Sequence, residues 1–71
     1  MKNQNEVNEI IEYYAGQKDA GSQDNLVAML REIQETEGCI SKEVREFVQE
    51  RMGIKESFLG CILKMYPSLK S

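Results

Sequence analysis

Residues 30–41 read Leu-Arg-Glu-Ile-Gln-Glu-Thr-Glu-Gly-Cys-Ile-Ser, and this stretch decides the fold. Its first half continues a helical pattern, in which apolar residues recur three or four positions apart: Leu26, Met29, Leu30 and Ile33. Gly38 can end that helix, because glycine adopts the left-handed conformation at little cost. Ser41 can cap the next helix by accepting a hydrogen bond from a free backbone amide. We therefore predict helices over about 24–37 and 42–52, joined by a tight corner.

The same periodicity extends to both ends of the chain. The helix over 42–52 carries one apolar face and is followed by Gly53 and Ile54. A further helix is predicted over 56–66, since Pro67 cannot continue a helix interior. At the other end, apolar residues spaced like one helical stripe predict a helix over 6–15: Val7, Ile10, Ile11 and Tyr14. Gly16 is expected to stop it in a left-handed conformation, before a polar loop over 16–22.

No segment shows the strict alternation of a half-buried strand. The predicted fold is all-α: a compact bundle of three principal helices plus an N-terminal helix, forming a single domain over residues 1–71. The last helix is unusual, because its apolar positions cover more than one stripe: Phe58, Leu59, Ile62, Leu63, Met65 and Tyr66. So wide an arc indicates either burial on two sides or a surface open to a partner.

The length and composition of the chain narrow the classes of function that we expect for it. A chain of 71 residues cannot enclose a deep cavity and keep a packed core, so we do not expect it to be an enzyme by itself. It has no histidine, the commonest general base and metal ligand, and its glycines form no phosphate-binding loop. The net charge of −3 disfavours nucleic acid. No apolar run suggests a signal peptide or a membrane span, which predicts a cytoplasmic protein without membrane insertion.

The two cysteines could be redox-active or structural thiols. Cys39 lies in the predicted corner before Ser41, where a half-buried structural thiol is favoured over a reactive one. Cys61 falls on the apolar arc of the last helix, and a buried structural thiol is expected there. A disulfide between them is not expected in a reducing compartment.

The run over 30–41, the step into Lys42-Glu43-Val44, and the sequence Met52-Gly53-Ile54-Lys55-Glu56-Ser57-Phe58-Leu59-Gly60 together resemble a known pattern. They look like the N-terminal helical domain of the thioredoxin-like [2Fe–2S] ferredoxin subunit family of NADH:quinone oxidoreductases and NAD(P)-reducing hydrogenases. In that family an Ile-Gln pair and an acidic turn precede a glycine, a capping residue and another amphipathic helix. A glycine-containing final helix then leads into a ferredoxin domain. The resemblance spans about residues 7–66.

Three departures from the family pattern stand out. Cys39 occupies a position that is usually aromatic, and the segment after Leu63 differs from the family's usual helix end. The thioredoxin-like domain, whose four cysteines hold a [2Fe–2S] cluster in that family, is not among these residues. No cofactor or metal is therefore expected in this chain, and the cluster is expected only in such a following domain.

The resemblance implies a non-catalytic assembly or docking domain of an NAD(P)-linked iron–sulfur oxidoreductase, of the hydrogenase or NADH dehydrogenase type. Its expected partner is a flavoprotein or ferredoxin-domain subunit. The alternative is a small helix-turn-helix protein with a DNA-binding or regulatory role, in which Lys42, Arg45 and Arg51 would be the basic contacts to DNA. The candidate partner interface is Met65, Tyr66 and Leu69, although these residues could instead complete the core and leave a frayed tail.

Overall fold

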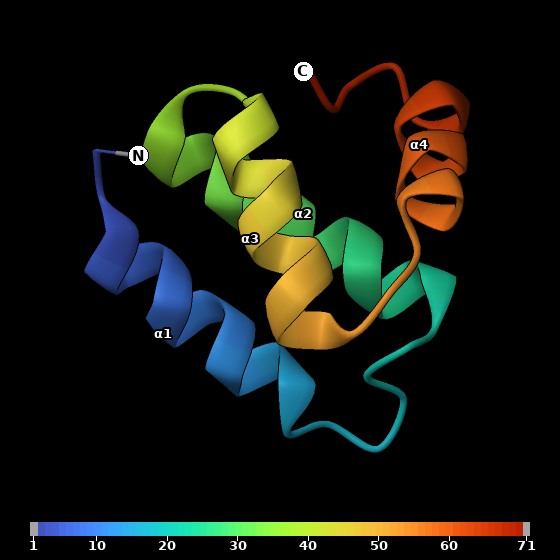
Figure 1. Ribbon diagram of the computed structural model, residues 1–71, viewed down its shortest axis with the longest axis horizontal. Helices are drawn as coiled ribbons and strands as arrows, with labels where there is room; N and C mark the ends of the chain where they lie inside the picture. Colours follow the sequence, from blue (N-terminus) through green and yellow to red (C-terminus); the bar gives the residue numbers. More distant parts are fainter. Residues whose placement is uncertain (1, 71) are drawn as a thin grey trace.

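The structure is a computed structural model that describes residues 2–70. It contains the helices α1 (Gln4–Ala15), α2 (Gln23–Glu37), α3 (Lys42–Met52) and α4 (Glu56–Met65), and no strand within the described residues (Figure 1). The predicted all-α fold is confirmed. The bounds differ little from those expected: α1 begins at Gln4 rather than residue 6, and α4 ends at Met65 rather than residue 66. None of the described helices is both long and apolar enough to cross a membrane.

The four helices pack as a small, compact bundle, as predicted. Figure 1 shows α1 (blue) running beside α2 and α3, while α4 (orange) stands at the opposite side of the molecule. The most extensive helix pairing is between α1 and α2, and α3 also contacts α1 and α4. Because Val7 and Ile11 of α1 are fully buried, the N-terminal helix is an integral part of the core.

The corners follow the local chemistry of the sequence. Ser22 caps α2 by accepting a hydrogen bond from the Asn25 amide at 3.2 Å, and Ser41 caps α3 through the Val44 amide at 3.3 Å. Gly38 ends α2 with a φ of 94°, in the left-handed region that favours glycine. Gly16 was expected to behave in the same way, but its φ is −82°. The chain continues from α1 into a right-handed turn, so no left-handed residue is required there.

The core is one apolar cluster to which every helix contributes. Among residues 2–70 no polar or charged residue is buried as a whole. The buried apolar residues are Val7, Ile11, Leu26, Val27, Met29, Leu30, Ile33, Ile40, Val44, Val48, Leu59, Ile62 and Leu69. Ile40 in the corner and Leu69 beyond α4 lie outside the helices, so the connections also help to close the core.

The last turn of α2 holds both the first and the last described segments of the chain. A carboxylate oxygen of Glu37 accepts from the Asn3 amide at 2.6 Å, and the other accepts from the Lys2 amide at 3.2 Å. This carboxylate binds free amides at the start of α1, for which the Asn3 side chain provides no cap.

Gln34 does the same for the segment after α4. Its amide nitrogen donates to the Ser68 carbonyl at 2.9 Å, and its amide oxygen accepts from the Lys70 amide at 2.5 Å. The Lys70 carbonyl in turn accepts from the Ile40 amide at 2.6 Å. We call residues 66–70 the C-terminal strap. These bonds hold the strap against α2 and place Leu69 in the core.

Candidate interaction surface on the fourth helix

The wide apolar arc of α4 divides into an inner and an outer face. Leu59 and Ile62 are buried, and Leu63 and Tyr66 pack half-buried against them. The outer face exposes Phe58 by 38% and Met65 by 55%, with an exposed Cys61 between them. Because these three residues are spaced by three and four positions, they form a single line along the helix. We call this line the α4 stripe.

Cys61 corrects an expectation from the sequence. Its thiol was expected to be buried, but it is exposed, because it projects from the side of α4 that faces away from the core. Its Sγ lies 3.9 Å from the Sδ of Met65, one helical turn away. Cys39 is also exposed, in the corner after Gly38, rather than half-buried as expected. Both cysteines are free thiols.

The three residues predicted as a partner interface do not share one surface. Met65 is exposed and belongs to the α4 stripe. Tyr66 is half-buried, and its hydroxyl accepts a hydrogen bond from the Gln23 side chain at 2.8 Å. Leu69 is only 4% exposed, because the strap folds back over α2 and inserts it into the core. Leu69 therefore stabilises the fold and is not available at the surface.

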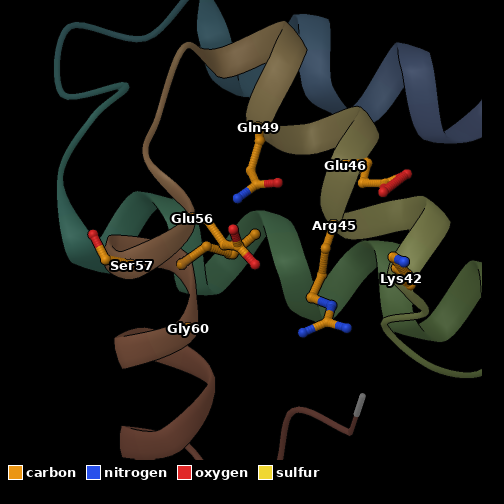
Figure 2. Close-up of a pocket in the computed structure, with 8 residues that line it drawn as sticks. Lys42, Arg45, Glu46, Gln49, Glu56, Ser57 and Gly60 are labelled. Carbon is orange, nitrogen blue, oxygen red and sulfur yellow. The ribbon is translucent and has the colours of Figure 1, made fainter.

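A groove between α3 and α4 was not foreseen from the sequence. It has a volume of about 500 Å³. Its lining residues are Lys42, Arg45, Glu46, Gln49, Glu56, Ser57, Leu59 and Gly60. Figure 2 shows Arg45 reaching from α3, and Glu56 reaching from α4, toward the space between the two helices. Within residues 2–70, no ion pair joins these two side chains. We call this feature the α3–α4 groove.

Two details of the groove need explanation. The Nε of Arg45 is buried and has no hydrogen-bond partner within residues 2–70. Gly60 stands in the interior of α4, and a Cβ added there would meet nothing within 4 Å. A glycine inside a helix was visible in the sequence as a poor helix former, and this signal could have drawn attention to the groove. The partnerless nitrogen of Arg45 had no sequence signal.

The basic residues that were predicted as DNA contacts do not all lie on one face of α3. Lys42 and Arg45 border the α3–α4 groove, whereas Arg51 lies 3.6 Å from a carboxylate oxygen of Glu12 in α1. The Arg51 guanidinium also lies 5.6 Å from the centre of the Phe47 ring. The arrangement therefore does not form the continuous basic surface that a DNA-binding helix uses.

Tyr14 carries the one clear pKa shift among the described residues. Its hydroxyl donates a hydrogen bond to the Glu32 carboxylate, which joins α1 to α2. This bond to Glu32, reinforced by desolvation and by the carboxylate's charge, raises the pKa of Tyr14 from 10.0 to about 12. The pair lies between α1 and α2, away from the α4 stripe, and we interpret it as a structural contact. Within residues 2–70, no three cysteine or carboxylate side chains gather where they could hold a metal ion.

Comparisons with protein-family models, curated proteins and solved structures give no match. The function must therefore be inferred from the chain's own surfaces and from the resemblance of its motifs.

Proposed function

We propose that the chain is a non-catalytic docking domain that binds another protein through the α4 stripe. Following the resemblance described above, we assign the partner to the flavoprotein or ferredoxin-domain subunits of NAD(P)-linked oxidoreductases. In that setting the domain braces one subunit against another and takes no part in electron transfer.

The α4 stripe is the observation that carries the proposal. An aromatic ring, a thiol and a thioether lie in one line on a helix whose opposite face is fixed in the core. Aromatic and methionine side chains are enriched at the centres of protein interfaces, because they remove much apolar surface from water. A thioether also adapts its shape to a partner more readily than a branched side chain does.

Several polar side chains bind backbone groups of this chain, which is consistent with a docking role. Glu37 and Gln34 bind backbone groups of residues 2–3 and 68–70, and Ser22 and Ser41 cap helices. These groups are engaged in holding a rigid fold, which is what a bracing domain requires. In the family that the chain resembles, the final helix of the helical domain precedes the ferredoxin domain, and the resemblance equates α4 with that helix.

Affinity purification from the source cells tests the proposal. The full chain, tagged at residue 1, is expected to retain a subunit identified by mass spectrometry as a flavoprotein or an iron–sulfur protein, with the matching visible absorption. Phe58→Ser combined with Met65→Ser should reduce the recovered subunit about tenfold, since losing about 1.4 kcal/mol of binding has that effect.

Tyr13→Ser is the matched control. Tyr13 is 66% exposed on α1, so this variant removes a larger exposed aromatic side chain from a different part of the surface. Circular dichroism should show the parent helicity in all variants. Retention of the same subunit by the double variant, or recovery of a subunit of another class, would contradict the proposal.

A further inference from the structure

We infer that the α3–α4 groove is a second contact for the docked protein and receives an acidic side chain of that protein, which pairs with Arg45. This inference rests on the proposed docking function and adds a chemical requirement for the partner. The α4 stripe supplies apolar contact, whereas the groove selects for charge.

Arg45 is the first reason. A guanidinium offers five N–H donors in a rigid plane, and it pairs best with a carboxylate through two parallel hydrogen bonds. Within the described residues, the Nε of Arg45 is removed from solvent without an acceptor. Arg45 as a whole is half-buried and lines the groove, so a carboxylate that enters the groove can approach its guanidinium. Arginine is also among the residues most enriched at the energetic centres of interfaces.

Gly60 is the second and independent reason. Glycine disfavours a helix interior, and one of its uses is to let a neighbour approach the backbone closely. Among residues 2–70, nothing occupies the space beside Gly60. Its φ is not in the left-handed region, so the backbone does not require glycine either. The open space at the groove is therefore suited to a segment of another protein packed directly on α4.

The charges of the groove favour a carboxylate over a phosphate. Lys42 and Arg45 are balanced by Glu46 and Glu56, which line the same groove. Because these four charges cancel, the groove holds no excess positive charge to offset a doubly charged phosphate, whereas a single carboxylate needs only the guanidinium of Arg45 as its partner. Figure 2 shows Glu56 across the gap from Arg45, where its negative charge opposes an incoming acid.

The test is an NMR titration of the full chain with a capped five-residue peptide, four alanines around a central glutamate. The same peptide with a central glutamine is the comparison. We expect the glutamate peptide to shift the Arg45 Nε–H signal and the amide signals of Ser57 and Gly60. Its affinity should exceed that of the glutamine peptide by about tenfold, which corresponds to about 1.4 kcal/mol.

Variants with opposite expected effects sharpen this test. Arg45→Gln should bring the glutamate peptide to the level of the glutamine peptide, while Glu56→Gln should strengthen its binding at least twofold by removing the opposing carboxylate. Glu50→Gln, an exposed acidic residue of α3 outside the groove, is the matched control and should change neither. Equal binding of the two peptides, or no effect of Arg45→Gln in a folded variant, overturns the inference.

Gly60→Ala separates binding from stability. Because the added Cβ meets nothing within the described residues, we expect the melting temperature to rise by about 4–8 °C. Recovery of the purified partner should nevertheless fall at least tenfold. A stabilised variant that retains the partner in full would show that close approach at Gly60 is not needed, and would overturn this part of the inference.

Other occupants give distinct results. If inorganic phosphate shifts the Arg45 Nε–H signal more than the glutamate peptide does, the ligand of the groove is a phosphate and not a carboxylate. Shifts of the same signals with protein concentration alone would identify a second copy of the chain as the occupant. If the expected oxidoreductase partner is recovered equally by Arg45→Gln, the groove assignment fails and the docking function stands. If no such partner is recovered although the peptide binds, the docking function fails instead.

Discussion

Leu69→Ala tests whether the C-terminal strap is part of the fold. Leu69 is 4% exposed and is held in place by the hydrogen bonds that Gln34 makes to Ser68 and Lys70. Replacing a buried leucine by alanine costs about 2–5 kcal/mol. We expect about 2–3 kcal/mol here, because the strap can move inward and fill part of the space.

This loss is large for so small a protein. Domains are stabilised by about 0.05–0.15 kcal/mol per residue, which amounts to about 4–10 kcal/mol for this chain. In a domain of this size, 1 kcal/mol shifts the melting temperature by about 4–8 °C. Leu69→Ala should therefore lower the melting temperature by about 10–20 °C, measured by circular dichroism at the helical minimum. Lys70→Ala is the control, because its side chain is exposed and its backbone bonds are kept.

Gln34→Met provides a second perturbation of the same contact. It keeps the shape of the side chain and removes its two hydrogen bonds, at a cost of about 1–2 kcal/mol. The double variant with Leu69→Ala should lose less unfolding free energy than the two single variants lose together, because both side chains act only when the strap is docked. A free energy of unfolding for Leu69→Ala within about 0.5 kcal/mol of the parent would refute this reasoning and show a frayed tail.

Three further outcomes are expected. Glu32→Gln should lower the pKa of Tyr14 from about 12 toward 10.0, which the absorbance of the phenolate measures. In the parent protein, the bond between Tyr14 and Glu32 contributes its full stability below pH 10.0, and this contribution is lost as the pH rises toward 12. An unchanged titration would exclude the Glu32 bond as the cause. Ser41→Ala should destabilise the fold by about 1 kcal/mol through loss of the α3 cap, measured by urea unfolding, whereas Ser41→Asp should not. Cys61 should react with a thiol reagent in the folded protein at a rate close to that in denaturant, and strong protection would contradict its exposure.

The helices and corners were predictable because they depend on local signals. Gly38 and Ser41 end one helix and begin the next through their own backbone geometry and side-chain oxygen, with no help from distant residues. The apolar period set the faces of α2 and α3 for the same reason. Gly16 shows the limit of such inference, because a glycine after a helix permits a left-handed residue without requiring one.

The surfaces were harder to predict because they depend on how the elements meet. The breadth of the α4 arc correctly raised the possibility of an exposed apolar face, but only the packing of Leu59 and Ile62 decided which half faces outward. That choice exposed Cys61. The return of the strap buried Leu69, and it depends on Gln34, more than thirty residues away in the sequence. The groove at Arg45 likewise arises from the relative placement of two helices.

Because Glu37 and Gln34 lie one turn apart, residues 2–3 and residues 68–70 are anchored on neighbouring parts of α2. Residues 2–3 and residues 68–70 therefore lie close together, although they are far apart in the sequence. A short linker joining these two segments, with a new opening cut in the 16–22 loop, would preserve every helix while reordering them along the backbone. Any protein fused to both of these segments at once would likewise pull on the last turns of α2, where Glu37 and Gln34 hold the two segments.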